Sequence, residues 1–122
     1  MSDTPVPAYL VVCGTTIGEM DPRYGEHAAG VAEKAELAPL AGGLIGTKVE
    51  VLEGELPPGE TLLAVERCAS VEAAKEFYYS PEYQKAIEFR KDSIKIHFIA
   101  VAETITEEEL EAAAAAAAEA NG

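Results

Sequence analysis

Two histidines are the residues of this 122-residue sequence best suited to moving a proton at neutral pH. His27 follows Tyr24 by three residues, so both side chains lie on one side if the segment is helical. In a cleft, His27 would act as a general base on a bound small molecule, and Tyr24 would orient that molecule. The alternative is a structural histidine whose ring is satisfied by Glu26, a backbone carbonyl or water.

Further side chains suited to binding a small organic molecule lie in the second half of the sequence. The hydroxyl groups of Tyr78 and Tyr83 would hold a polar substituent, although aromatic residues at helical spacing more often belong to a core. Arg90 carries a planar guanidinium that matches a carboxylate, with an ion pair to a nearby acid as the alternative. His97 lies on a predicted strand, where it would reach the cavity or a dimer contact, or serve a structural role.

The sequence lacks the motifs of metal and phosphate sites. It has no CxxC, HxH or HExxH spacing, so we expect no metal ion. Gly42 and Gly43 lack the downstream glycine and lysine of a phosphate-binding loop, and we expect chemistry without a cofactor. Cys13 and Cys68 lie in apolar segments, which indicates small buried side chains in place of a disulfide.

Composition and charge narrow the classes of partner. Nine Lys and Arg against 22 Asp and Glu give a formal charge of −13, which disfavours nucleic acid and anionic membrane surfaces. The sequence contains no run of about 18 apolar residues, the length that a transmembrane helix needs. The first residues carry no basic region and no signal-peptide core, so we expect a cytoplasmic protein.

Apolar patterning predicts four strands. They are expected at residues 8–16, 44–53, 61–67 and 93–101. The second would be bent or broken near Gly46 and Thr47. In the fourth, strict alternation places His97 on the same face as Ile99 and Val101.

Capping residues predict where the helices begin. Asp21 and Pro22 start the first helix, which is expected to end at Pro39 and the two glycines that follow. Ser70 and Ser80 cap two shorter helices. The buried stripe of the first helix would contain Tyr24, Ala28, Val31 and Ala35.

The resulting order, β-α-β-β-α-β, is that of an α+β, ferredoxin-like fold. The helices cover one face of its antiparallel sheet, but strand 8–16 is apolar on both faces. A homodimer, sheet against sheet, would cover the second face. Residues 1–103 would form this domain, and residues 104–122 an Ala-rich helical extension that begins with a capping box at Thr106. That extension would pack on a neighbouring subunit or extend into solvent.

Three segments resemble a known family: Val49-Glu50-Val51-Leu52-Glu53-Gly54, Pro57-Pro58-Gly59 and, above all, Phe77-Tyr78-x-Ser80-Pro81-Glu82-Tyr83-Gln84. Over about residues 8–103, the chain is similar to domain-of-unknown-function family 1330 of the dimeric α+β barrel superfamily. The resemblance implies two sheets facing each other in a homodimeric barrel. The superfamily includes cofactor-free monooxygenases, muconolactone isomerases, polyketide cyclases and haem-dependent chlorite dismutases, so a shared fold does not imply a shared chemistry.

Two functions are compatible with these observations. The first is a cofactor-free isomerase, cyclase or lyase, or monooxygenase that acts on a small organic molecule in a cleft between sheet and helices. The second is a non-catalytic module for binding a small ligand or for oligomeric assembly, which the Ala-rich extension would suit. Haem held by His27 or His97 is a weaker third hypothesis.

Overall fold

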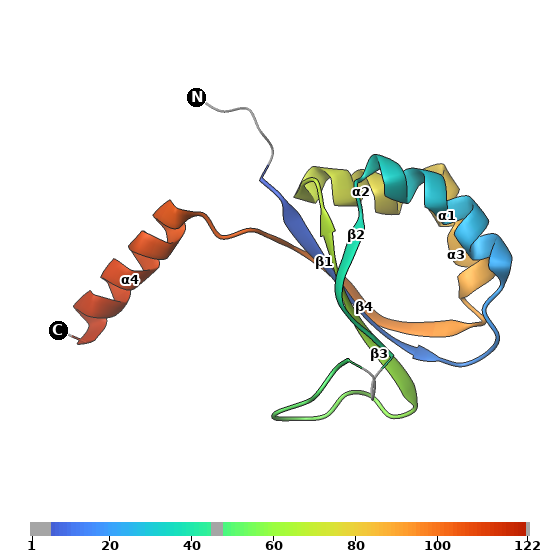
Figure 1. The fold of residues 1–122 in the computed structure, drawn as a ribbon, viewed down its shortest axis with the longest axis horizontal. Helices are drawn as coiled ribbons and strands as arrows, with labels where there is room; N and C mark the ends of the chain where they lie inside the picture. Colours follow the sequence, from blue (N-terminus) through green and yellow to red (C-terminus); the bar gives the residue numbers. More distant parts are fainter. Residues whose placement is uncertain (1–5, 45–47, 122) are drawn as a thin grey trace.

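The computed structural model of the chain describes residues 6–44 and 48–121. Its antiparallel sheet has the order β2-β3-β1-β4 and consists of β1 (Ala8–Thr16), β2 (Ala38–Leu44), β3 (Glu60–Cys68) and β4 (Ile94–Glu103). The helices are α1 (Pro22–Lys34), α2 (Val71–Tyr79), α3 (Pro81–Arg90) and α4 (Glu107–Asn121). Helices α1 to α3 lie on one face of the sheet and α4 projects away from the domain (Figure 1). The predicted α+β, ferredoxin-like fold with an extra C-terminal helix is confirmed.

The predicted helix starts are also confirmed. The Asp21 carboxylate accepts a hydrogen bond from the Arg23 backbone N–H at 3.0 Å, and Pro22 is the first helical residue of α1. The Ser70 hydroxyl caps α2. Ser80 ends α2 and caps α3, so the chain turns sharply between the two helices.

Helix α1 ends earlier than predicted, at Lys34. Glu36 adopts the left-handed conformation with φ 56°, and its backbone N–H donates to the Glu33 carbonyl oxygen. The N–H of Leu37 donates to the Ala32 carbonyl oxygen at 3.1 Å, which completes a Schellman motif. Glycine usually occupies that left-handed position, so a glutamate there gives no sign of a helix end in the sequence.

Because α1 ends early, the second strand also lies earlier than predicted. The prediction of a strand at residues 44–53 is wrong, since β2 spans Ala38–Leu44 and pairs with β3. Gly42 has φ 94°, and a Cβ atom there would overlap the carbonyl oxygen of Leu63, so the close approach requires glycine. Residues 48–59 form a loop, and residues 45–47, where the predicted break falls, lie outside the described residues.

A bulge changes which residues of β4 face the helices. The register of the β1–β4 pair shifts between Cys13, which faces Phe98, and Gly14, which faces Ile96, so His97 is the extra residue. Ile96 and Ile99 consequently line the same cavity although they are three residues apart. The prediction that His97 shares a face with Ile99 and Val101 is therefore wrong.

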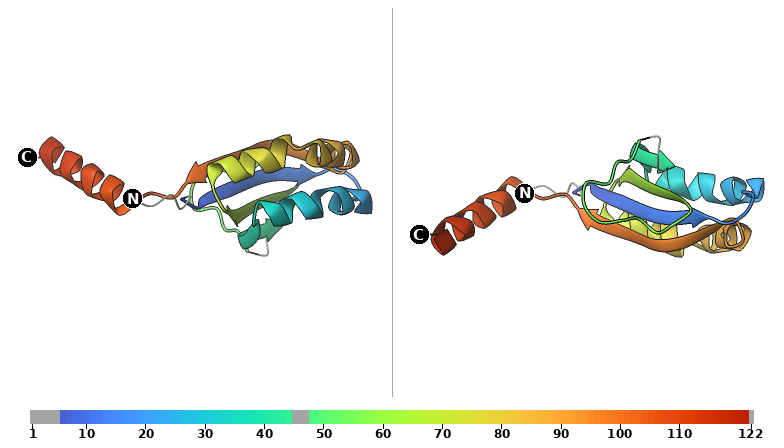
Figure 2. Two further views of the ribbon diagram at one scale, coloured as in Figure 1. Left: turned by 90° about the horizontal axis from the view of Figure 1, so that it is seen from above. Right: turned by 90° about the horizontal axis from the view of Figure 1, so that it is seen from below.

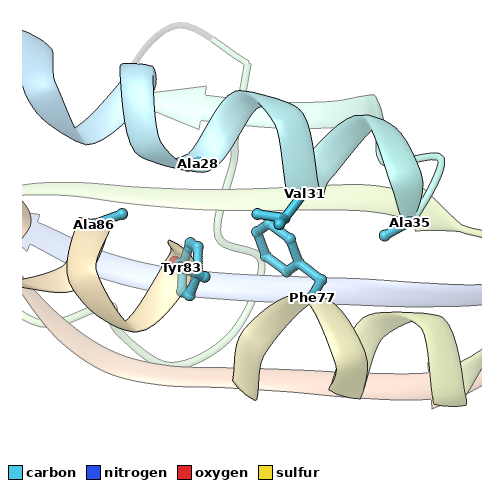
Figure 3. Close-up of a cluster of buried hydrophobic side chains, with 6 residues drawn as sticks. All are labelled: Ala28, Val31, Ala35, Phe77, Tyr83 and Ala86. Carbon is cyan, nitrogen blue, oxygen red and sulfur yellow. The ribbon is translucent and has the colours of Figure 1, made fainter. Parts of the chain in front are cut away.

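Buried side chains form two separate clusters. One joins the helices to one another and contains Ala28, Val31, Ala35, Phe77, Tyr83 and Ala86 (Figure 3), which confirms most of the predicted stripe of α1. The other joins the sheet to α2 and contains Ala8, Leu10, Cys68 and Ala74. Seen from opposite sides, the helices lie over one face of the sheet and loop 48–59 crosses the other (Figure 2). A cavity lies between the sheet and the helices and is lined by residues of both layers.

Candidate functional site

A cavity of about 430 Å³ lies between the helices and the sheet. Most of its lining is apolar and comes from β1, β3, β4 and the three helices above them, for example Leu10, Val12, Ala28, Leu37, Leu62 and Ile96. The polar side chains in the lining are Tyr24, Glu66, Tyr78, Tyr83 and Arg90. An apolar cavity of this size with a few polar groups is typical of a small-molecule site.

A second cavity, of about 440 Å³, adjoins the first between α2 and β4. Leu10, Tyr78, Arg90, Ile96 and Ile99 line both cavities, so the two meet at these residues. The amino group of Lys75, in the lining of the second cavity, lies 3.9 Å from the exposed carboxylate of Glu72. Tyr78 and Arg90 thus contribute polar groups to both cavities.

Two tyrosines meet where α1 and α3 approach each other. The hydroxyl oxygens of Tyr24 and Tyr83 are 3.0 Å apart, and their rings meet edge to face with centroids 6.1 Å apart. Burial raises the pKa of the Tyr83 phenol far above its ordinary value, and the neighbouring Tyr24 raises it further. Tyr83 therefore stays protonated at physiological pH and can donate a hydrogen bond.

Arg90 is the last residue of α3 and is buried, with 8% of its surface exposed. Its Cζ atom lies 5.7 Å from the centroid of the Tyr83 ring, within the range of a cation–π contact. The described part of the chain contains two ion pairs, Arg23 with Asp21 and Lys75 with Glu72, and neither involves Arg90. The guanidinium thus borders both cavities without an acidic partner among the described residues.

Glu66 is a cavity residue that sequence reasoning missed. It lies on β3 opposite Leu10 of β1, on the side of the sheet that the helices cover. Burial raises the pKa of its carboxyl group above the ordinary value of 4.5. The sequence held one signal for Glu66: residues 62, 64 and 66 of a strand point to the same face of the sheet. Leu62 and Ala64 also line the cavity.

His27 lies to one side of this site. Its ring stacks on Phe89 of α3 with centroids 5.2 Å apart and an angle of 13° between the planes. The guanidinium of Arg23 also lies over the Phe89 ring, at 4.5 Å from its centroid. His27 lines neither of the two cavities.

His97 belongs to a chain of hydrogen bonds on the other face of the sheet. The Thr61 hydroxyl donates to the Pro57 carbonyl oxygen at 2.6 Å, so its oxygen accepts from Thr15 at 2.8 Å. The Thr15 oxygen in turn accepts from Nε2 of His97 at 2.7 Å. Since each hydroxyl has one proton to donate, this order assigns the Nε2–H tautomer to a neutral His97. His97 therefore helps to fasten loop 48–59 to the sheet.

Neither a metal centre nor a membrane span is found in the residues described. Across residues 6–44 and 48–121, no group of three or more His, Cys, Asp or Glu side chains is placed to hold a metal ion. Within the same ranges, no helix is long and apolar enough to cross a membrane. Cys13 and Cys68 are free and buried, as their apolar surroundings in the sequence predicted.

The family of this chain follows from comparison with known proteins. The family described as "Domain of unknown function (DUF1330)" matches residues 7–104. The chain belongs to this family. The resemblance carried by the segment from Val49 to Gln84 is thus confirmed, and the match covers the sheet and α1 to α3 of the DUF1330 domain but not α4.

Two solved structures with TM-scores above 0.5 share the fold of this DUF1330 domain. The crystal structure of a protein of unknown function from Rhodopseudomonas palustris is 14% identical, covers 83% of this chain and 84% of that chain, and has a TM-score of 0.62. A methylated form of that protein has a TM-score of 0.54. A putative antibiotic biosynthesis monooxygenase from Chloroflexus aurantiacus is 12% identical over 82% of this chain and 94% of that chain, with a TM-score of 0.46. The comparison with curated proteins found no match.

The DUF1330 domain brings four of the six predicted site residues together. Tyr24, Tyr78, Tyr83 and Arg90 line one cavity, although they come from three helices. The two predicted histidines lie apart from this cavity. His27 is stacked on Phe89, and His97 is hydrogen-bonded to Thr15.

Proposed function

We propose that this chain binds a small organic molecule in the cavity between helices and sheet and transfers a proton within that molecule without a cofactor. One observation carries the proposal: the Glu66 carboxyl group, with its raised pKa, shares an apolar cavity with the hydrogen-bonded hydroxyls of Tyr24 and Tyr83. A carboxyl group whose pKa is raised towards neutrality is suited to act as a general acid and base.

The chemistry that fits these groups best is an isomerisation. The Glu66 carboxylate would remove a proton from a carbon next to a carbonyl group and return it at another carbon, so that no co-reactant is consumed. The phenol of Tyr83 stays protonated, and its hydroxyl or that of Tyr24 would stabilise the negative charge that develops on the carbonyl oxygen. The apolar walls would keep water away from that charge.

Glu66 and His27 are two separate candidates for the proton-transfer residue. The sequence favoured His27, whose imidazole ordinarily titrates nearer neutrality than a carboxyl group does. The position of His27 on Phe89 favours Glu66, because a base must lie within hydrogen-bond reach of the proton it removes. Variants of the two residues therefore provide a direct comparison.

The experiment measures conversion in a mixture of small molecules extracted from cells. Wild-type protein, Glu66→Gln and His27→Phe are incubated with the extract without added cofactor, and mass spectrometry follows compounds that disappear or appear. We expect a product of unchanged mass with the wild type, a loss of about 10²- to 10⁴-fold in rate with Glu66→Gln, and near-normal rates with His27→Phe. Loss of rate in His27→Phe alone would move the proton transfer to His27.

The same experiment distinguishes the second candidate function, a non-catalytic binding module. The observation that favours that candidate is α4, whose residues 107–120 are exposed and carry an alanine run suited to assembly. A compound retained by the protein through desalting, but never converted, would support the binding module. If no compound is retained and none is converted, both functions are contradicted.

A further inference from the structure

We infer that the ligand of this cavity is an apolar monocarboxylate whose carboxylate binds Arg90 where the two cavities meet. The inference rests on the proposed function, because it names the class of molecule that the same site binds. It draws on three features of the described residues: the burial of Arg90, the position of its guanidinium over Tyr83, and the distribution of charge in the two linings.

The first feature is a buried cation without a protein counter-ion. Arg90 is 8% exposed, whereas the arginine and lysine of the two described ion pairs, Arg23 and Lys75, have side chains that are 61% and 57% exposed. The chain has 22 acidic residues against nine basic ones, yet no ion pair of Arg90 is found among the described residues. No fully buried side-chain nitrogen or oxygen among the described residues lacks a hydrogen-bond partner, so the guanidinium nitrogens of Arg90 are open to the two cavities, where an anionic ligand could pair with them.

The second feature is how the guanidinium is held. The Tyr83 ring, at 5.7 Å from Cζ of Arg90, is itself held by the hydroxyl contact with Tyr24 and by packing on Phe77. A guanidinium beside an aromatic ring keeps N–H groups in its own plane available for hydrogen bonds. Its fork of donors matches the two oxygens of a carboxylate.

The third feature is the distribution of charge along the cavities. The lining of the cavity between α2 and β4 contains two basic residues, Lys75 and Arg90, and no acidic residue. In the adjoining cavity the acidic residue is Glu66 and most of the remaining lining is apolar. A molecule with its carboxylate at Arg90 and an apolar body reaching towards Glu66 would match both the charge and the apolar surface.

One guanidinium also selects among anions. A monocarboxylate carries one negative charge, which Arg90 balances, whereas a phosphate monoester carries nearly two at neutral pH. Lys75 is 57% exposed at its side chain and lies near Glu72, so it contributes little further charge to the site. We therefore expect carboxylates to bind in preference to phosphate esters.

The experiment compares matched probes that differ in charge. Binding of trans-cinnamate and octanoate is measured by saturation-transfer NMR and calorimetry, alongside cinnamamide, octanamide and phenyl phosphate. We expect each acid to bind about tenfold more tightly than its amide, as a charge-assisted hydrogen bond implies, and phenyl phosphate to bind no better than the amides. Equal binding of acids and amides would overturn the inference and leave the proposed function standing.

Variants assign the preference to Arg90. Arg90→Met retains the volume and removes the charge, so acids and amides should bind equally well; Arg90→Lys keeps the charge without the planar fork and should retain part of the preference. Arg67→Met is the matched control, because Arg67 is exposed and lines neither cavity. An unchanged preference in Arg90→Met would overturn the inference. Failure of every probe to bind at millimolar concentration would count against both this inference and the proposed function.

Discussion

The hydroxyl oxygens of Tyr24 and Tyr83 lie 3.0 Å apart, although 59 residues separate them in the chain. This contact joins α1 to α3 at the edge of the cavity, where both rings contribute to the lining. It also places a phenol that stays protonated beside Arg90, whose guanidinium lies over the Tyr83 ring. The contact therefore links the packing of the helices to the polar groups of the site.

We expect Tyr24→Phe to lower the free energy of unfolding by about 1 kcal/mol, because it removes one hydrogen bond and leaves the Tyr83 hydroxyl without that partner. Tyr83→Phe should lower the free energy of unfolding less in the Tyr24→Phe variant than in the wild type, since the two hydroxyls interact. Chemical denaturation of the single and double variants measures this coupling. Tyr79→Phe is the control, because Tyr79 is 71% exposed. Strict additivity of the two changes would contradict the contact.

We expect Glu66→Gln to stabilise the protein at neutral pH. The pKa of the Glu66 carboxyl group is raised by burial, so the folded state favours its protonated form. The stability that this preference provides is complete at a pH below the pKa of Glu66 in the unfolded state, ordinarily 4.5. It is lost as pH rises through the pKa of Glu66 in the folded state. The melting temperatures of Glu66→Gln and wild type should thus differ most near pH 7.5 and converge below about pH 4.5.

The matched control for that pH series is Glu60→Gln, since Glu60 is exposed on the same strand. Its melting temperature should follow that of the wild type across the series. If the difference in melting temperature between Glu66→Gln and wild type grew as the pH was lowered, the pKa of Glu66 would not be raised.

We expect the protein to be a homodimer that buries the face of the sheet opposite the helices. On that face Val11 lies between Val65 and Ala100 of the neighbouring strands, and Phe98 is 46% exposed. Loop 48–59 crosses this face, and a second copy would cover the apolar side chains that the loop leaves exposed. Sedimentation at micromolar concentration should give the mass of two chains or a multiple.

The variant that tests this face is Phe98→Glu, which places a charge on it and should yield monomers. Tyr79→Glu, on an exposed position of α2, is its control and should leave the mass unchanged. A well-folded wild-type monomer would contradict the sheet-to-sheet dimer.

We expect residues 1–104 to fold without α4. Both the backbone N–H and the hydroxyl of Thr104 donate to the Pro7 carbonyl oxygen, at 3.0 and 2.7 Å, so hydrogen bonds hold Thr104 to the residue before β1. A chain ending at Glu103 should be less stable than one ending at Thr104, by about 1 to 2 kcal/mol. Thermal denaturation of both chains measures the difference.

Sedimentation of the same two chains tests the role of α4. If α4 packs on a neighbouring subunit, both chains should lose a higher assembly state that the 122-residue chain forms. Unchanged mass and melting temperature in the chain ending at Thr104 would assign α4 to solvent. Unfolding of that chain would contradict the predicted domain boundary.

The sequence alone was sufficient for the features that depend on local preference. Strand β1 follows from its β-branched and aromatic residues, and the starts of α1, α2 and α3 follow from Asp21, Ser70 and Ser80. The order of elements then limited the topology to the ferredoxin-like one. The end of α1 escaped prediction because Glu36 adopts a conformation that glutamate rarely favours.

Tertiary structure decided the site. Helical spacing placed Tyr24 and His27 on one side of α1. A helix can pack against both a sheet and another helix, however, and His27 faces Phe89 of α3. The bulge at His97 reverses the alternation of β4, which no count along the sequence detects. Glu66 became a candidate once its neighbours across the sheet and the helices above it were known, since burial, which raises its pKa, is a property of the assembled fold.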